Sequence, residues 1–173
     1  MRNEKIIPIE IYTDGSCKKM ANRTFGAWAF VVVVDNELKY YASESFCETT
    51  NQRMELLAAI EALKYISEIK QPNERVIIYS DSAYLINCYE QEWWVNWRNN
   101  GWRNANKKEV ANQDLWWELI PYFEKFGYDF SSEALYKNSY YLLTKTDKTK
   151  QKNVNKLKEL LLKIEVKPLE IEL

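Results

Sequence analysis

Three carboxylates stand where they could bind a metal ion together. Asp14 follows an apolar segment at residues 5–13, and Asp81 follows another at residues 75–80. We expect both segments to be strands, and the carboxyl ends of strands are where α/β sheets usually build ligand sites. If the two strands are neighbours, the two carboxylates converge. An aspartate that only forms a turn after a strand is common, so the spacing alone leaves both interpretations open.

Glu55 lies on the packed side of a predicted helix. At about 100° per residue it shares a face with Ala59, Ala62 and Ile66, opposite the charged Lys64. A carboxylate on such a face is costly unless a cation or a partner compensates it. The alternative is that Glu55, one turn into the helix, reaches solvent or interacts with the positive N-terminus of the helix.

The chain contains no histidine. This excludes Ser-His-Asp and Cys-His triads, His-ligated zinc and imidazole general bases. The cysteines at positions 17, 47 and 88 are odd in number and lack metal-ligand spacing, so neither a disulfide nor a zinc site is expected. Hydrolysis would have to rest on carboxylates, amides, lysines or a metal ion.

The composition fits one globular domain. The 173 residues are 46% hydrophobic and 28% charged, and we expect a single domain over residues 1–173 with its core at 5–164 and a tail at 165–173. A net charge of −1 excludes a globally basic surface but permits local basic patches. No apolar run reaches about 18 residues and the start is charged, so we expect a cytoplasmic monomer that does not contact membranes.

The apolar pattern predicts the elements that hold these side chains. Asp14-Gly15-Ser16 should end the first strand, Asp35-Asn36 should form a hairpin turn, and Pro121 should kink or shorten its helix. Strands are expected at 5–13, 26–34, 37–47, 75–80 and, poorly defined, within 128–143; helices are expected at about 51–69, after Ser82, from about 113, and at 154–164. This order indicates a mixed α/β sheet with helices packed on it.

Several short motifs resemble one known family, type 1 ribonuclease H. They are Asp14-Gly15-Ser16-Cys17, residues 49–56 (TTNQRMEL), Tyr79-Ser80-Asp81-Ser82, Asn100-Gly101-Trp102, Asn106-Lys107-Lys108 and Asp114-Leu115-Trp116. The resemblance runs from about residue 9 to about residue 119 with its spacings intact. It implies an α/β fold with a five-stranded mixed sheet flanked by helices and a basic handle. It also implies an endonuclease that hydrolyses the RNA strand of RNA–DNA hybrids.

By this resemblance, Asp14, Glu55 and Asp81 match the first three metal-binding acids of the family. The implied cofactors are two Mg²⁺ ions, for which Mn²⁺ substitutes. One ion activates the attacking water and the other stabilises the leaving 3′ oxygen. Carboxylate oxygens are the hard ligands that Mg²⁺ prefers.

The chain departs from the family at the fourth acid. In Val154-Asn155-Lys156-Leu157, Asn155 stands where the family has an aspartate, and it offers a metal a neutral oxygen without charge. The family's loop with a His next to Gly is also missing from residues 144–148, and two departures in one region favour natural divergence over a deliberate substitution. Three acids in this loosely aligned region remain alternatives for the fourth ligand: Asp129, Glu133 and Asp147.

Residues 93–108 match the family's basic handle. They include four tryptophans, four cations and no acid. The cations Arg98, Arg103, Lys107 and Lys108 are expected to neutralise phosphates. We expect Trp93 to contact nucleic acid; the tryptophans at 97, 102 and 116 fit packing roles better.

Two further segments are candidates for nucleic-acid binding. Thr50, Asn51 and Gln52, by the resemblance, would bind a DNA phosphate and read the RNA 2′-hydroxyls in the wide minor groove. The lysines between 145 and 158 are either a second phosphate-binding cluster or a solvated face.

Two other functions remain open. A hybrid- or double-stranded-RNA-binding module with weak or no catalysis is favoured by Asn155 and by the missing histidine. A protein-interaction domain that kept only the fold is disfavoured, because a cluster of like charges such as Asp14, Glu55 and Asp81 does not help the fold itself.

Overall fold

The computed structural model describes residues 7–69, 75–129 and 141–145. Its strands are β1 (Ile9–Met20), β2 (Arg23–Val34), β3 (Glu37–Cys47), β4 (Val76–Ser80) and β5 (Tyr141–Lys145). Its helices are α1 (Asn51–Ile69), α2 (Ala83–Glu90), α3 (Trp93–Asn99) and α4 (Gln113–Asp129). The helix expected at 154–164, and with it Asn155, lies outside the described residues.

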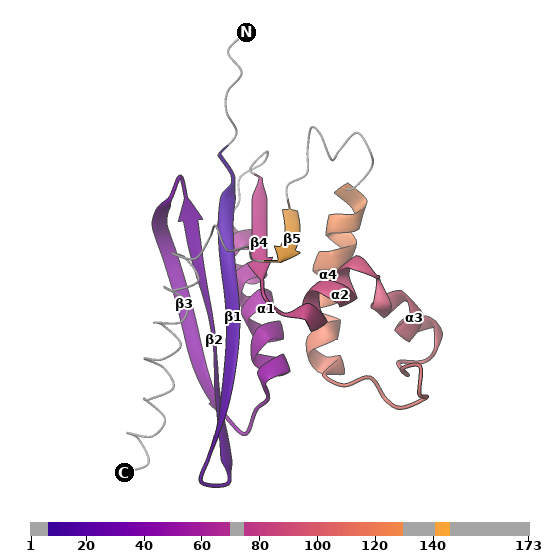
Figure 1. Cartoon of the computed structure of the whole chain (residues 1–173). Coiled ribbons are helices and arrows are strands. Elements are labelled where there is room, and N and C mark those ends of the chain that lie inside the picture. Colours follow the sequence, from indigo (N-terminus) through magenta and orange to yellow (C-terminus); the bar gives the residue numbers. More distant parts are fainter. Residues whose placement is uncertain (1–6, 70–74, 130–140, 146–173) are drawn as a thin grey trace.

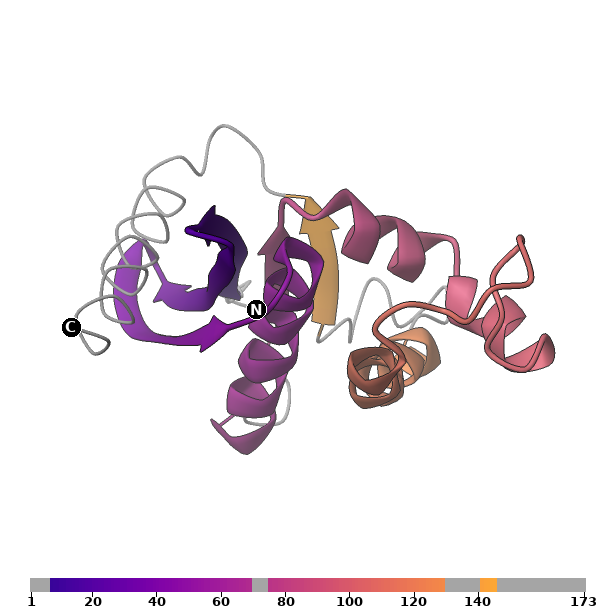
Figure 2. The same cartoon turned by 90° about the horizontal axis from the view of Figure 1, so that it is seen from below.

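The strands form one mixed sheet in the order β3-β2-β1-β4-β5. β1, β2 and β3 pair in antiparallel fashion, whereas β4 runs parallel to both β1 and β5. α1 packs against β1 and β2, and α4 packs against α1 (Figure 1). Figure 2 shows α3 at the end of the molecule farthest from β3. The predicted mixed sheet with helices packed on it is therefore observed.

Turn and cap residues set the bounds of the N-terminal elements. Asp35 and Asn36 have φ values of 50° and 63°, the left-handed pair that a two-residue type I′ hairpin requires. The predicted turn is confirmed, and β3 spans the predicted residues 37–47. Thr50 caps α1, because its Oγ1 accepts a hydrogen bond from Arg53 N at 3.2 Å.

The main core lies between the sheet and α1. The packed side of α1 consists of Met54, Leu56, Ala58, Ala59, Ile60, Ala62, Leu63 and Ile66. On the opposite face of the sheet, Tyr12 of β1 stacks on Tyr79 of β4 with ring centroids 4.7 Å apart. Both hydroxyls donate to Glu10 at 3.2 Å. These contacts fix the register of β1 against β4, which places the acids that follow.

Several boundaries differ from the sequence predictions; β2, for example, begins at Arg23 rather than at residue 26. β1 does not end at Asp14 but continues to Met20, because β2 pairs with it over its whole length. Pro121 does not shorten α4, which continues to Asp129. Its buried side chains on both sides of the proline, including Trp116 and Phe123, compensate for the missing N–H. The late strand, expected within 128–143, is β5 at 141–145; residues 128 and 129 belong to α4 instead.

Candidate functional site

Asp14 and Asp81 follow the last residue pair of two adjacent parallel strands. Thr13 of β1 pairs with Ser80 of β4, and the Thr13 hydroxyl donates to Tyr79 O at 3.0 Å. The condition for convergence, that the two strands are neighbours, is met. Asp14 is half-buried within β1 rather than at its end, and Asp81 is exposed in the connection to α2. The end of the parallel β1–β4 ladder brings both backbones to one place.

Glu55 approaches the same place from α1. Gly15, next to Asp14, is buried directly beneath the helix: a Cβ there would lie 2.8 Å from Glu55 Cα and closer still to Glu55 N and Met54 C. Only glycine permits this backbone contact. The contact holds the first turn of α1 against β1, and therefore holds the Glu55 backbone against Gly15, the residue that follows Asp14.

The ionisation of Glu55 is affected by its burial and by Asp81. Burial raises the pKa of Glu55, the charge of Asp81 raises it further, and a hydrogen bond from the Ser82 hydroxyl opposes both. Ser82 is itself buried and caps α2 by accepting from Leu85 N at 3.1 Å. Burial and the nearby Asp81 both destabilise the ionised form of Glu55. A bound cation would stabilise that ionised form instead.

The ligand atoms at this site are of the type that hard divalent cations prefer. Three carboxylates from β1, α1 and the β4–α2 connection offer oxygen ligands, which Mg²⁺ and Mn²⁺ favour. In the part of the chain that is described, no three Cys, Asp or Glu side chains gather into a closed ligand cluster. The backbone thus brings the acids to one end of the ladder, and side-chain rotation would have to complete the ligand set.

The N-terminus of α1 presents the predicted contact residues to solvent. Thr50, Asn51 and Gln52 are all exposed. The preceding Thr49 is buried, and its methyl group would lie 2.5 Å from a Cβ added to Gly26 of β2. The two glycines, Gly15 and Gly26, therefore let the start of α1 rest directly on β1 and β2.

The segment 93–108 forms α3 and a closed loop. Val110 N donates to Trp102 O at 3.0 Å and Asn104 N donates to Lys108 O at 2.8 Å, which ties the loop together. We call residues 93–108 the handle. Trp97 and Trp102 pack against the core, as the sequence suggested, and the Trp97 ring centroid lies 5.4 Å from that of the buried Trp116. Trp93, which was expected to contact nucleic acid, is half-buried and packs against the same core, with its ring next to those of Tyr84 and Trp97.

A pocket opens on the handle where Trp93 was predicted to make contact. It has a volume of about 340 Å³ and is lined by Trp93, Asn96, Trp97, Asn100, Arg103 and Ala105. Neither asparagine was predicted to contact nucleic acid, although Asn100 belongs to the motif Asn100-Gly101-Trp102. Asn96 lies in α3 and Asn100 caps its C-terminus four residues later, and this spacing was the available signal.

The four handle cations are not equivalent. Arg98 forms an ion pair with Glu124 of α4, and this contact raises the pKa of the Arg98 guanidinium. Arg103 Nη1 donates to Lys107 O at 3.0 Å within the loop, and Lys107 and Lys108 are exposed. Three of the cations thus gather on the loop, whereas Arg98 faces α4.

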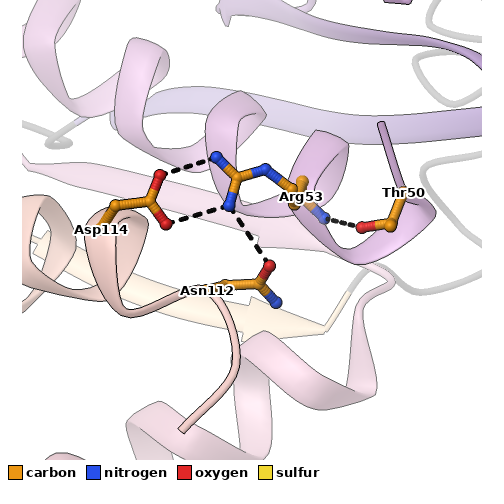
Figure 3. A network of polar contacts seen from close by, with 4 residues as sticks. All are labelled: Thr50, Arg53, Asn112 and Asp114. Atoms are coloured by element: carbon orange, nitrogen blue, oxygen red, sulfur yellow. Dashed lines mark hydrogen bonds and ion pairs between the residues drawn. The ribbon is translucent and has the colours of Figure 1, made fainter. Parts of the chain in front are cut away.

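Arg53 joins the start of α1 to the start of α4 (Figure 3). Its Nη1 and Nη2 donate to the two carboxylate oxygens of Asp114 at 2.9 and 2.7 Å. Nη1 also donates to Asn112 Oδ1 at 3.4 Å. The Arg53 guanidinium lowers the pKa of Asp114. Sequence patterns gave no sign of this contact, because the paired residues are far apart in the chain.

Comparison with known proteins identifies relatives for most of the chain. A family model described as RNase H matches residues 7–130. A ribonuclease H of Syntrophomonas wolfei is 48% identical over 117 residues, covering 68% of this chain and 76% of the relative. A ribonuclease H of Acetivibrio thermocellus is 46% identical over 111 residues, covering 64% and 71%.

Solved structures share the fold. A foamy viral protease-reverse transcriptase in complex with dsDNA matches with a TM-score of 0.69 and 23% identity, over 92% of this chain and 94% of that one. LC11-RNase H1 in complex with an RNA/DNA hybrid matches with a TM-score of 0.62 and 18% identity, over 93% and 99%. Among the described helices, none is long and apolar enough to cross a membrane.

Proposed function

Because this chain belongs to the ribonuclease H family, we propose that it hydrolyses the RNA strand of RNA–DNA hybrids at a site built by Asp14, Glu55, Asp81 and Asn155. The chain is an endoribonuclease of the ribonuclease H type. The observation that supports the site most directly is the half-buried Glu55, whose pKa is raised by burial and by Asp81. We propose that residues 1–173 act as one domain and as a monomer.

The acids supply the anionic oxygens of the reaction. Mg²⁺ ions, with Mn²⁺ as a substitute, supply Lewis acidity toward the scissile phosphate and its attacking water when bound. Asp14 and Asp81 offer carboxylates from the end of the β1–β4 ladder, and Glu55 offers a third from α1. In the balanced reaction a water oxygen bonds to phosphorus, the bond to the 3′ oxygen breaks, and that oxygen leaves with a proton.

Asn155 is proposed as the fourth ligand. A neutral amide in that position leaves one negative charge fewer to offset the metal ions than an aspartate would. Divalent ions bind more weakly as the ligand charge falls. We therefore expect activity that requires high Mg²⁺ and is better supported by Mn²⁺, which binds nitrogen- and oxygen-rich sites somewhat more tightly.

Two surfaces are proposed to hold the hybrid. Thr50, Asn51 and Gln52 are exposed at the start of α1, where the helix dipole favours a phosphate and the amide side chains can reach 2′-hydroxyls. The handle would hold the DNA strand through Trp93, Arg98, Arg103, Lys107 and Lys108. Its pocket pairs indole faces with amide and guanidinium donors, a combination that suits a sugar-phosphate backbone.

A binding module with weak or no catalysis is the alternative, and Asn155 is the feature that favours it. One experiment separates the two. The protein is incubated in Mg²⁺ or Mn²⁺ with four substrates: a hybrid labelled on the RNA strand, the same hybrid labelled on the DNA strand, single-stranded RNA and a DNA duplex. Binding of the hybrid is measured separately in Ca²⁺. We expect cleavage of the hybrid's RNA strand alone. Tight binding without cleavage in either metal would support the binding module.

A further inference from the structure

The contact between Arg53 and Asp114 joins the two surfaces proposed to bind the hybrid. Arg53 lies three residues after Thr50, and its own N–H donates to the Thr50 hydroxyl at 3.2 Å. Its guanidinium reaches Asn112 and Asp114 at the point where the chain leaves the handle and enters α4 (Figure 3). The same residue therefore contacts the cap of α1 and the exit of the handle.

The exit of the handle is held on more than one side. Asn112 has a φ of 60°, a left-handed conformation, and its carbonyl accepts from Leu115 N at 3.0 Å and from Trp116 N at 3.1 Å. Its side chain also forms a hydrogen bond with the Tyr84 hydroxyl; burial raises the pKa of Tyr84, and its hydrogen bonds with Trp116 and Asn112 offset part of that rise. Residues on both sides of Asn112 then reach into the handle: Val110 N and Gln113 Nε2 both donate to Trp102 O, at 3.0 and 3.5 Å.

A second ion pair between the same helices makes a natural comparison. Lys64 of α1 reaches Glu118 of α4 at 3.4 Å, and its side chain is 47% exposed against 33% for Arg53. This pair lies farther along α1, away from Thr50, and Lys64 is shared with Glu61. Lys64 thus also links α1 to α4, so this link alone does not require Arg53. Arg53 is needed to link the cap of α1 to the exit of the handle.

We propose that Arg53 is a positioning residue for substrate binding, which holds the handle at a fixed place relative to Thr50, Asn51 and Gln52. The inference rests on the proposed function, since it concerns the binding of one hybrid by both surfaces. Two linked contacts bind tightly only when their spacing is fixed beforehand, because otherwise binding must also supply the ordering. The planar guanidinium suits this task, since it holds both carboxylate oxygens of Asp114 in one orientation.

The test compares Arg53→Met and Arg53→Lys with the control Lys64→Met. Each is placed in two backgrounds, the unaltered chain and a handle in which Arg103, Lys107 and Lys108 are replaced by Gln. KM and kcat for hybrid cleavage are measured in Mn²⁺, and Kd for the labelled hybrid is measured in Ca²⁺. All variants are assayed well below the lowest Tm in the set.

In the unaltered background, Arg53→Met should raise KM and Kd about fivefold, which corresponds to about 1 kcal/mol, and should leave kcat within about twofold. In the handle-neutralised background the rise should fall to nearly nothing, since no second contact remains to be positioned. Arg53→Lys should be intermediate, because an ammonium can reach Asp114 but cannot hold both of its oxygens and Asn112. Lys64→Met should leave KM unchanged.

Four results would overturn the inference. These are an unchanged KM in Arg53→Met, an equal rise in both backgrounds, an equal rise in Lys64→Met, and a loss confined to kcat. If Arg53→Met does not fold, Asp114→Asn removes the partner's charge at constant size and is read in the same way. A chain that binds hybrid but cleaves none refutes the proposed function alone, since Kd still decides the role of Arg53. A chain that binds no hybrid refutes both.

Discussion

Replacing Gly15 with alanine tests how the backbone of β1 positions Glu55. The added Cβ would lie 2.8 Å from Glu55 Cα and closer still to Glu55 N and Met54 C. All three atoms belong to the backbone of α1, so no side chain can rotate out of the way. The helix must move away from β1, and Glu55 must move with it.

The size of the effect follows from overpacking. Extra atoms forced into a well-packed interior cost about 1–3 kcal/mol, and contact with rigid backbone places Gly15→Ala at the upper end. At about 2–4 °C per kcal/mol for a chain of this size, Tm should fall by about 6–12 °C. Because Glu55 is displaced from Asp81, kcat should fall even at temperatures where the variant is fully folded, and KM for the hybrid should rise as well, since Thr50, Asn51 and Gln52 move with the start of α1.

Two other glycines provide a scale for the stability measurement. A Cβ on Gly101 would meet nothing within 4 Å, but its φ of +64° makes a left-handed alanine cost about 1–2 kcal/mol. A Cβ on Gly26 would meet the side chains of Thr49 and Met54 before any backbone, and side chains can move. Thermal unfolding should therefore rank Gly15→Ala as the most destabilised of the three.

The cleavage rate shows whether the contact at Gly15 sets the position of Glu55. Cleavage rates are compared at a temperature where Gly15→Ala is fully folded by circular dichroism. A Gly15→Ala protein with the Tm and kcat of the unaltered chain would show that α1 does not rest on β1 as described. A lowered Tm with an unchanged kcat would show that the position of Glu55 is not set by this contact.

Three further predictions concern charge. Since burial and Asp81 raise the pKa of Glu55 above its usual 4.5, its contribution to stability is present below about pH 4.5 and lost as pH rises through the folded-state pKa. Glu55→Gln should thus raise Tm at pH 7 in chelator and give no gain near pH 4; equal gains at both would contradict this. Replacing Arg103, Lys107 and Lys108 with Gln should reduce the slope of log Kd against log salt concentration for hybrid binding, by about 0.9 per lost phosphate contact as on B-form duplexes. The control Arg98→Gln should reduce this slope less, because Arg98 pairs with Glu124. An unchanged slope in the triple variant would exclude the handle as a phosphate contact. Asn155→Asp should lower the metal concentration needed for cleavage and Asn155→Ala should raise it; superimposed metal titrations would show that Asn155 is not a ligand and would leave Asp129, Glu133 and Asp147 as candidates.

Local chemistry made the N-terminal elements predictable. The Asp35-Asn36 turn is a signal contained within two adjacent residues. For the same reason β3 and α1 have the expected bounds. The helical period also predicted that Glu55 lies on the packed face of α1. Ala59, Ala62 and Ile66, which share that face, are buried.

Pairing between distant segments could not be read in the same way. Asp14-Gly15-Ser16 looks like a turn locally, and only the long β2 strand shows that β1 continues through it. Pro121 by itself predicts a kinked or shortened helix, but α4 continues past it, with Trp116 and Phe123 buried on either side. The partners of Arg53 and Arg98, namely Asp114 and Glu124, depend on how α4 lies against its neighbours, which no periodicity encodes.

The most direct test of the account is the comparison of cleavage with binding in Asp81→Asn. The substitution removes one anionic oxygen ligand at the end of the β1–β4 ladder and leaves both proposed binding surfaces intact. Hybrid cleavage in Mn²⁺ and Kd in Ca²⁺ are measured beside the unaltered chain. We expect cleavage to be abolished while Kd changes less than about threefold. Cleavage that persists at the unaltered rate, or binding that is lost together with cleavage, would contradict it.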